Sequence, residues 1–427
     1  MGELTVLRVP SAPLDGPDAL KVRLASLTDL LERAAPFWRM RPFEGLPLPW
    51  EADYPDLSAW LRALSPERVE ALHLDPAGLR EAPGPLPGLV AEVARLTDVG
   101  RLPAASLVEL PDPVPRVSGR KRVQVQAFVA AAERALPEGV ELLVDWCCGK
   151  GHLGRALSAT LGVVSLGLER DPELCHTGRD LAAGTDAVCA FVPTDVLDPT
   201  RWPAVPPLRA AVVSLHACGA LTDAAMAFAL DGHARAVLLA PCCYHFTRGD
   251  EPFVPRSEAG RAAGLAWDAA ALRLPTLEEV VAPPAVRRRR RQEAAWRLAL
   301  DLLVREATGV DTYTSIGPLA SGWQHGDFHT FATGVANAHA LALPPGWDPI
   351  RAEAAGFERA GIVAALGLVR SQLRRAVELW LVLDRALRLA DAGWDVQVGA
   401  FCGRSATPRN LVIAGWHPVV KRGGGDG

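Results

Sequence analysis

Long apolar runs are missing from this sequence. No stretch of its 427 residues approaches the ~18 consecutive apolar residues that a membrane-spanning helix requires. The N-terminal stretch MGELTVLRVPSAPLDG lacks the basic region, hydrophobic core and cleavage site of a secretory signal peptide. Val6 stands where the myristoylation pattern requires Ser or Thr. These absences predict a cytoplasmic protein that does not contact a membrane.

Strong charge of one sign and a disulfide framework are also lacking. The formal net charge of −4 excludes a basic coat for nucleic acid over the whole surface, although it allows a local basic patch. The eight cysteines include two adjacent pairs, unlike the evenly spread framework of a small secreted disulfide fold, so we expect reduced thiols. The chain is 49% hydrophobic and long enough for two or three domains with sizeable cores.

Changes in hydrophobic period divide the chain into four segments. Residues 1–117 carry no glycine-rich turn, and the i, i+3, i+4, i+7 spacing of apolar residues after Pro55 predicts a helical N-terminal lobe. Residues 118–245 alternate short apolar runs with helical patterns, as in a parallel sheet covered by helices on both faces. Residues 246–368 carry helix signals only, which predicts a helical insertion over the substrate cleft. Residues 369–427 predict a long helix and an antiparallel β-hairpin that closes the sheet.

Acidic residues and glycines follow the first three predicted strands. In an open parallel sheet, ligands bind beyond the carboxyl ends of the strands. The first strand leads into Asp145, Gly149 and Gly151, and glycines there let the backbone approach a ligand closely. Glu169 ends the second strand, where an acid can accept both ribose hydroxyls of an adenosine, and Asp195 after the third strand could accept from an adenine amino group.

This arrangement of acids favours S-adenosylmethionine over a dinucleotide, because Asp145 would repel a pyrophosphate. The alternative interpretation is that the acids cap helices and that the glycines form ordinary turns. An oxidoreductase that uses NAD also stays open at this point, although the same repulsion counts against it.

Thiols and imidazoles gather at the carboxyl ends of the first, fourth and fifth predicted strands. They are Cys147, Cys148, His216, Cys218, Cys242, Cys243 and His245. Structural zinc sites prefer cysteines separated by roughly two to four residues. These cysteines are adjacent, and adjacent residues on a strand point to opposite faces, so we expect no metal site. Small thiols that line a tight pocket are one interpretation. A thiol nucleophile with His216 or His245 as its base is another.

The residues expected near a methyl acceptor lie in the stretches SLHACGALTD and APCCYHF. The candidate catalytic residues are His216, Cys218, Asp223, Tyr244 and His245. Tyr244 can stack on a base or donate a hydrogen bond, and His245 can accept a proton near neutral pH. The alternatives are a rim aromatic for Tyr244 and a histidine hydrogen-bonded to a helix N-terminus for His216.

The stretches DWCCGKGHLG, HACGALTD, PCCYHF and TPRNLVI together resemble one methyltransferase family. The sequence is similar to the class I methyltransferase domain of methyltransferase-like protein 25 and of the glutathione S-transferase C-terminal domain-containing protein. It is more distantly similar to the acceptor-stem tRNA 2′-O-methyltransferase. The resemblance covers residues 119 to 415, approximately.

The resemblance implies an α/β fold with a Rossmann-like, seven-stranded class I methyltransferase sheet. It also implies S-adenosylmethionine as cofactor, held by Asp145, Cys147, Gly149, Gly151, Glu169 and Asp195. Cys147 departs from the family turn, in which a first glycine is common, and we expect binding to tolerate it. No [DN]-P-P-[FY] motif follows the fourth strand, which disfavours an adenine-N6 or amide-nitrogen acceptor and leaves the acceptor atom open.

Five consecutive arginines, Arg287–Arg291, open a predicted helix after Pro284. Exposed cations at a helix N-terminus oppose its dipole at about 0.3–1 kcal/mol each, so we expect an external anion to compensate them. Phosphates would do so, and Arg120 and Lys121 would extend the patch. A solvated charge run on a flexible loop is the alternative.

The sequence therefore predicts an S-adenosylmethionine-dependent methyltransferase that acts on RNA, either tRNA or rRNA. A protein or small-molecule acceptor is one alternative. A catalytically degenerate methyltransferase fold that serves as an RNA-binding module is another. The oligomeric state is not indicated.

Overall fold

The computed structural model describes residues 12–105, 119–249, 251–277, 282–319 and 322–419. The chain divides into two compact units. The first, which we call the sheet unit, comprises residues 1–32, 95–278 and 375–427. The second, which we call the helical unit, comprises residues 33–94 and 279–374. Among the described residues, no helix combines the length and hydrophobicity needed to cross a membrane.

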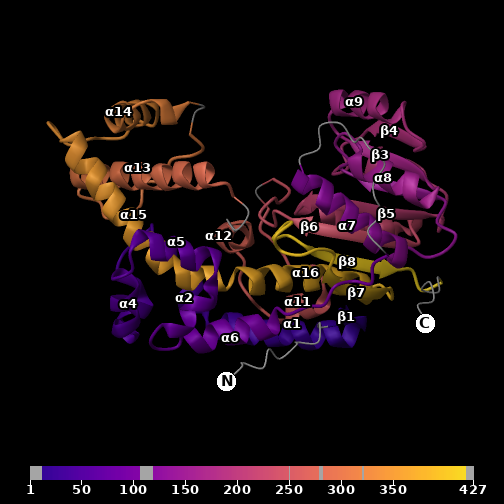
Figure 1. The fold of residues 1–427 in the computed structure, drawn as a ribbon, viewed down its shortest axis with the longest axis horizontal. Helices are drawn as coiled ribbons and strands as arrows, with labels where there is room; N and C mark the ends of the chain where they lie inside the picture. The colour runs from indigo at the N-terminus through magenta and orange to yellow at the C-terminus, as the bar shows by residue number, and fades with distance from the viewer. Residues whose placement is uncertain (1–11, 106–118, 250, 278–281, 320–321, 420–427) are drawn as a thin grey trace, which may run out of the picture. The chain divides into compact units, whose positions relative to one another are not determined.

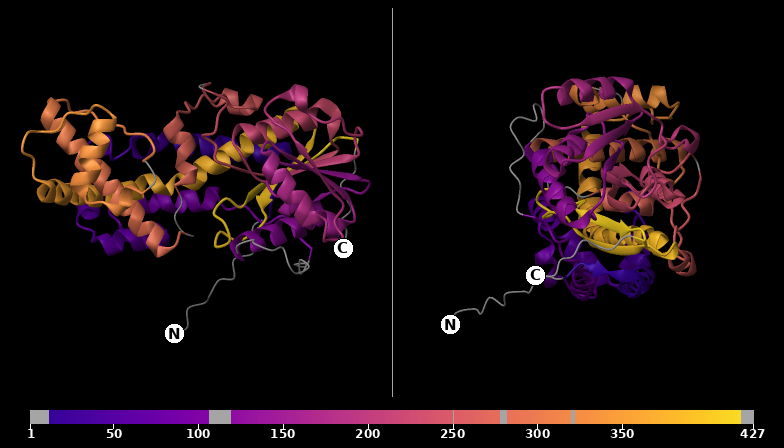
Figure 2. Two further views of the ribbon diagram at one scale, coloured as in Figure 1. Left: turned by 90° about the horizontal axis from the view of Figure 1, so that it is seen from above. Right: turned by 90° about the vertical axis from the view of Figure 1, so that its right-hand side faces the viewer.

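The strands of the described chain form a single sheet. They are β1 (Leu14–Asp15), β2 (Leu142–Trp146), β3 (Val164–Glu169), β4 (Cys189–Pro193), β5 (Ala210–Cys218), β6 (Ala236–Cys242), β7 (Asp395–Ala400) and β8 (Leu411–Trp416). Their order is β1-β7-β8-β6-β5-β2-β3-β4. Strands β2 to β6 are mutually parallel, and β8 is antiparallel to β6 and β7. The yellow strands β7 and β8 thus continue the magenta sheet (Figure 1; Figure 2).

The predicted α/β, Rossmann-like fold is confirmed. Each of the five predicted apolar runs forms a parallel strand. The inner strands β2, β5 and β6 are largely buried, since strands covered on both faces need few polar residues, whereas the edge strand β4 is largely exposed. The C-terminal hairpin is also present, but β8 lies inside the sheet between β6 and β7. The two-residue strand β1 adds an eighth strand beside β7 that is too short to leave a hydrophobic pattern.

Helices of the sheet unit surround the strands. They are α1 (Gly16–Arg33), α7 (Gly119–Ala135), α8 (His152–Leu161), α9 (Pro172–Ala182), α10 (Ala220–Phe228), α11 (Glu258–Ala262), α12 (Ala269–Arg273) and α16 (Arg374–Asp391), with the short turns η2 (Pro199–Arg201), η3 (Ala229–His233) and η4 (Leu274–Thr276). Phe128 of α7 and Leu157 of α8 share one buried cluster with Leu143 of β2. Because side chains alternate along a strand, Asp145 faces this side, whereas Trp146 packs against Phe228 on the other.

The helical unit is built around two long helices, α13 (Pro284–Thr308) and α15 (Pro349–Gln372). A Cβ on Gly356 of α15 would lie 2.5 Å from the carbonyl oxygen of Ala295 in α13, so a glycine is needed at this approach. The remaining elements are α2 (Ala35–Trp38), α3 (Pro49–Asp53), α4 (Pro55–Arg62), α5 (Pro66–Leu74), η1 (Pro76–Glu81), α6 (Leu86–Leu96), η5 (Trp323–His325) and α14 (Phe328–Ala338).

The structure distributes the four predicted segments differently. Residues 12–32 belong to the sheet unit, since β1 pairs with β7. Residues 251–277 also belong to it, because the backbone N–H groups of Arg256 and Ser257 donate to the fully buried Asp384 of α16 at 2.8–3.0 Å. The helical unit therefore joins part of the predicted N-terminal lobe to most of the predicted insertion.

Candidate cofactor and acceptor site

A cavity of about 220 Å³ opens where β2 ends, on the sheet face covered by α7 and α8. The residues that line it include Lys121, Asp145, Cys147, Gly149, His152 and Leu215. They come from α7, the turn after β2, the start of α8 and the end of β5. The structure thus places three of the predicted cofactor residues in one cavity at the predicted sheet edge.

The turn after β2 is left-handed at three positions. Cys147 has a φ of +57°, Gly149 one of +57° and Gly151 one of +68°. A Cβ on Gly151 would lie 2.4 Å from the ring of Phe191, whereas a Cβ on Gly149 would meet no atom within 4 Å. Gly151 is therefore needed for packing, and Gly149 leaves open space beside the cavity. A side chain in this conformation costs about 1–2 kcal/mol, and Cys147 carries that strain where the family turn has glycine.

Backbone N–H groups of this turn and of the start of α8 bind the acids of β3 and β2, respectively. The N–H of Gly154 donates to Oδ2 of Asp145 at 2.9 Å, and the N–H of Gly149 donates to Oε2 of Glu169 at 3.0 Å. Oδ1 of Asp195 accepts from the N–H of Leu197 at 3.1 Å. Each carboxylate keeps further lone pairs for a ligand, because a carboxylate can accept about four hydrogen bonds.

The three predicted cofactor acids all lie close enough to Cys147 to influence its pKa. Burial raises the pKa of the Cys147 thiol to about 12, and the neighbouring carboxylates of Glu169, Asp145 and Asp195 add to that rise. Asp145 itself is 3% exposed, and burial raises its pKa to about 7, while the ammonium of Lys121 acts in the opposite direction. Among the described residues, Asp145 has no cation within salt-bridge distance.

S-adenosylmethionine fits these residues. Its sulfonium and ammonium charges would supply the cation that the buried carboxylate of Asp145 lacks. The cavity is smaller than the ~300 Å³ at which small-molecule pockets begin, so the nucleoside would extend over Glu169 and Asp195 outside it. Both acids retain lone pairs for hydroxyl or amino donors.

His216 lies at a bulge of β5, where the pairing register with β6 shifts, and its φ is +74°. Its Nε2 lies 3.0 Å from Oε1 of Gln124, whose own Nε2 donates to the carbonyl of Ala406 at 2.9 Å. This orientation of the amide makes His216 Nε2 the protonated donor, so Nδ1 carries a lone pair and can accept a hydrogen bond. Nδ1 is buried without a partner among the described residues. Burial and Lys121 lower the pKa of His216 to about 4, so the ring is neutral.

Sequence reasoning does not single out two residues of this site. Gln124 and Lys121 both lie on α7, in a stretch that the sequence identifies only as a helix or as part of a basic patch. Lys121 is half-buried and lines the cavity, so it does not extend a basic surface patch. Residues that act through tertiary contacts carry no local motif.

Asp223 and Tyr244 both have partners within the protein. Asp223 pairs with Arg256 at 2.8 Å and with Arg385 at 3.1 Å, which makes it an ion-pair anchor of α10. Tyr244 is 1% exposed and the guanidinium of Arg385 covers its ring at 5.4 Å, so it offers no face to a base. His245 is half-buried, and its Nδ1 has no partner among the described residues.

Three of the thiols lie together at the ends of β5 and β6. The sulfur atoms of Cys218 and Cys242 are 3.6 Å apart, and those of Cys218, Cys242 and Cys243 all lie within 4.8 Å of one another. The strand alternation that argues against a shared metal does not hold here. Cys242 is the last residue of β6, and Cys243 has a φ of +44°, so the chain turns between them. The two adjacent thiols therefore reach the same place.

The arginine run forms the first turns of α13, and part of its charge is compensated within the helical unit. Arg287 and Arg291 both pair with Glu70 of α5. The expectation that an external anion compensates the whole run is therefore wrong for these two residues. Arg288 and Arg289 are exposed.

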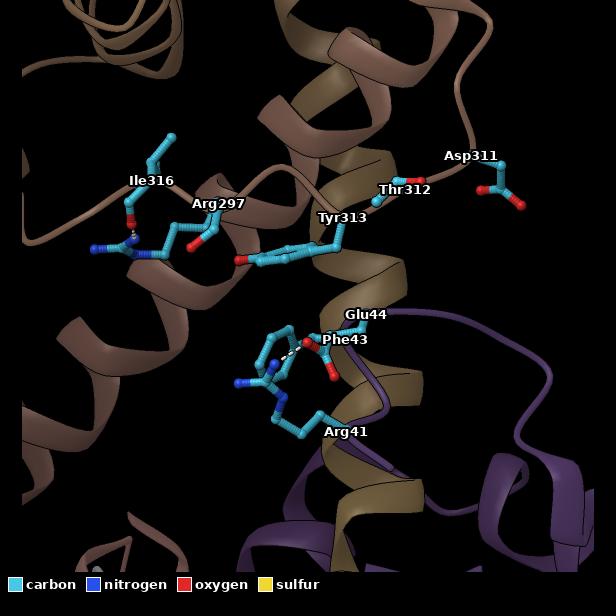
Figure 3. A pocket seen from close by; sticks show the side chains of 9 residues that line it. Arg41, Phe43, Glu44, Arg297, Asp311, Thr312, Tyr313 and Ile316 are labelled. Carbon is cyan, nitrogen blue, oxygen red and sulfur yellow. Dashed lines mark hydrogen bonds and ion pairs between the residues drawn. The ribbon is translucent and has the colours of Figure 1, made fainter. Parts of the chain in front are cut away.

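A second cavity, of about 450 Å³, lies in the helical unit (Figure 3). Its charged side chains are occupied by the protein itself. Arg41 pairs with Glu44, and Arg297 donates to the carbonyl of Ile316 at 2.7 Å. The ring of Tyr313 packs against Phe43 at 5.0 Å between centroids. These contacts are those of a structural crevice rather than of a reaction site.

One comparison with known protein families matches part of the sheet unit. Residues 120–249 match a family described as a methyltransferase domain. No curated protein matches the chain. Among solved structures, the chain is similar to magnesium protoporphyrin IX methyltransferase from Synechocystis with bound S-adenosylhomocysteine, at 17% identity and a TM-score of 0.23 over 30% of this chain and 61% of that one.

Two other solved structures have comparable sequence identities and TM-scores. The plantazolicin methyltransferase BpumL in complex with S-adenosylhomocysteine is 13% identical, with a TM-score of 0.22, over 40% of this chain and 60% of that one. The cyclopropane synthase MmaA2 from Mycobacterium tuberculosis is 12% identical, with a TM-score of 0.25, over 85% of this chain and 96% of that one. The chain therefore spans about 60% of the length of the first two structures.

The family match begins in α7 and ends just beyond β6, so it contains the five parallel strands, the left-handed turn and the acids at the strand ends. Residues 120–249 therefore match a methyltransferase domain, and their five parallel strands form part of a Rossmann-like sheet.

Proposed function

We propose that the cavity after β2 holds the amino-acid end of S-adenosylmethionine and that the methyl acceptor lies beside His216. When bound, S-adenosylmethionine supplies an electrophilic methyl group on a positively charged sulfur. The observation that carries the proposal is Asp145, a carboxylate buried at a cavity wall with a pKa raised to about 7 and no cation at salt-bridge distance among the described residues. A buried acid of this kind is stabilised by a cationic ligand.

The other residues of the site have separate roles in this proposal. Glu169, held by the N–H of Gly149, receives the ribose hydroxyls, and Asp195 receives the adenine amino group. In this proposal Nδ1 of His216, which is buried without a partner among the described residues, would accept a hydrogen bond from an O–H or N–H of the acceptor. Gln124 holds this ring in the required tautomer.

Titration calorimetry with S-adenosylhomocysteine tests the cofactor site. Glu169→Gln should weaken binding about 10- to 150-fold, since one hydrogen bond to a charged group contributes about 1.5–3 kcal/mol. Glu141→Gln is the matched control, because Glu141 lies at the other end of β2 and pairs with the exposed Arg209. Equal binding by the wild type and Glu169→Gln, or no binding by the wild type, would refute the assignment.

The acceptor that we propose is RNA. The support is the distant resemblance to the acceptor-stem tRNA 2′-O-methyltransferase and the exposure of Arg288 and Arg289 at the start of a 25-residue helix. Nucleoside digests of total RNA from cells with and without the gene should differ by one methylated nucleoside. Unchanged digests would instead indicate a protein or small-molecule acceptor.

RNA binding can be tested separately from methylation. Arg288→Gln with Arg289→Gln should reduce the slope of log affinity against log salt by up to about two phosphate contacts. Arg287→Gln with Arg291→Gln is the matched control, because Glu70 already pairs with both. If the two double variants change the slope equally, or if neither changes it, Arg288 and Arg289 do not contact phosphates.

A further inference from the structure

We propose that Cys218, Cys242 and Cys243 form a zinc site in which three thiolates bind the ion and one coordination position stays open to a donor from outside the protein. The site lies at the carboxyl ends of β5 and β6. It is independent of the cofactor assignment, because none of the three cysteines lines the cavity after β2.

The spacing of the sulfur atoms suits a tetrahedral ion. Zn–S bonds of ~2.3 Å place the sulfurs of a tetrahedral site about 3.8 Å apart. Cys218 and Cys242 are 3.6 Å apart at their sulfurs, and all three sulfurs lie within 4.8 Å of one another. Side-chain rotations that move a sulfur by about 1 Å therefore complete the geometry.

The backbone holds the three thiols in place without a metal. Cys218 and Cys242 are paired residues of β5 and β6, so their Cα positions are fixed by the sheet. The turn at Cys243 is fixed by two backbone hydrogen bonds, from the N–H of Phe246 to the carbonyl of Cys243 and from the N–H of Gly219 to the carbonyl of Cys242, each 2.9 Å long. A left-handed cysteine costs about 1–2 kcal/mol, and such strain is typical of ligand sites.

Glycine is required beside this turn. A Cβ on Gly219 would lie 2.1 Å from the carbonyl oxygen of Phe246, so the loop that carries Cys243 packs directly on the residue after Cys218. The two ligand-bearing segments are thus in contact along their backbones. A site in which the ligands are positioned in advance binds an ion without ordering a loop.

The surrounding charge balances the site. Three thiolates and a dication carry one net negative charge. Arg409 lies within electrostatic range of Cys218 and Cys243, and Lys121 lies within range of Cys242. Thiolate ligands select zinc over calcium or magnesium, which prefer oxygen ligands. Binding releases the thiol protons to solvent.

The fourth position has no protein ligand in this part of the structure. Among the described residues, no histidine, aspartate or glutamate joins the three sulfurs in the same 4.8 Å group. Zinc sites with three protein ligands and one open position are typical of catalysis, whereas structural sites are closed by four. Cys218 is also within electrostatic range of Cys147 in the cofactor turn. The three sulfurs and the turn after β2 thus lie at the same edge of the sheet.

Metal analysis of the full-length protein, purified under reducing conditions without chelator, tests the site. We expect about one zinc per wild-type chain. Single Cys→Ser variants at positions 218, 242 and 243 should each weaken zinc binding at least tenfold. Cys189→Ser and His245→Ala should retain the zinc, because neither residue belongs to the cluster. Loss of zinc in His245→Ala would overturn the three-thiolate site with its open position.

A second measurement avoids variants that fail to fold. Cobalt titrated into the reduced, metal-free wild type should produce a thiolate-to-cobalt charge-transfer band that saturates at one ion per chain and disappears when zinc is added. No band and no zinc would overturn the proposal. Mass spectrometry that finds Cys218 and Cys242 joined as a disulfide in freshly purified protein would also overturn it.

Discussion

Asp145 makes cofactor affinity depend on pH in a way that a single substitution removes. Burial raises its pKa from 3.8 to about 7, which corresponds to a difference of about 4 kcal/mol between the environments of its two protonation states. The acid is therefore half-protonated near neutral pH in the ligand-free protein. A cationic ligand binds the ionised form better, so binding below pH 7 must first release a proton.

The expected change follows from the fraction ionised. With a pKa of about 7, Asp145 is roughly one-tenth ionised at pH 6 and nine-tenths ionised at pH 8. If the ionised form binds about tenfold more tightly than the neutral form, S-adenosylmethionine should bind the wild type about fivefold more tightly at pH 8 than at pH 6. Asp145→Asn should then bind within about twofold of the wild type at pH 6 and about tenfold more weakly at pH 8. The α-ammonium of the ligand titrates at the same pH in both proteins and cancels in the comparison.

Titration calorimetry at pH 6, 7 and 8 and constant ionic strength measures both curves. Parallel curves for the two proteins, or tighter wild-type binding at pH 6, would refute the placement of Asp145 against the cationic end of the cofactor.

The raised pKa of Asp145 also predicts how the free energy of unfolding changes with pH. A raised pKa means that the folded state holds a proton that the unfolded chain has lost. The free energy of unfolding without ligand should therefore fall as pH rises from about 4 to 7 and then level off.

Further substitutions test the surroundings of this acid. Lys121→Met should move the midpoint of the pH dependence upward, because its ammonium favours the carboxylate of Asp145; an unmoved midpoint in the same calorimetric series would count against their coupling. Gly149→Ala should lower the free energy of unfolding by about 1–2 kcal/mol from backbone strain alone. Gly151→Ala, which adds a steric clash, should cost about 1–3 kcal/mol more in urea denaturation, and equal losses would contradict the close approach of Gly151 to Phe191. Gln124→Leu should destabilise the fold by about 2 kcal/mol in the same assay, because it leaves a buried imidazole N–H and a carbonyl unpaired; a neutral effect would place the histidine differently.

The strands and the acids at their ends could be predicted because both depend on local sequence. A parallel strand covered on both faces is a short apolar run, and the residue after it lies at the ligand edge whatever the rest of the chain does. Asp145, Glu169 and Asp195 are therefore recognisable from the sequence, and in the structure they lie near one another.

The acceptor side could not be predicted because it depends on backbone exceptions and distant partners. Strand alternation separates Cys242 from Cys243, but a left-handed residue brings their thiols together. Nothing near Asp223 in the sequence indicates that Arg256 and Arg385 neutralise it. Likewise, Glu70 is far in sequence from the arginines with which it pairs.

The structure of the protein with bound S-adenosylhomocysteine tests the central claim most directly. The account predicts ribose hydroxyls at about 2.6–3.2 Å from the carboxylate of Glu169 and the amino-acid end of the ligand in the cavity beside Asp145. A ligand bound elsewhere, or a nucleoside turned away from both acids, would contradict it.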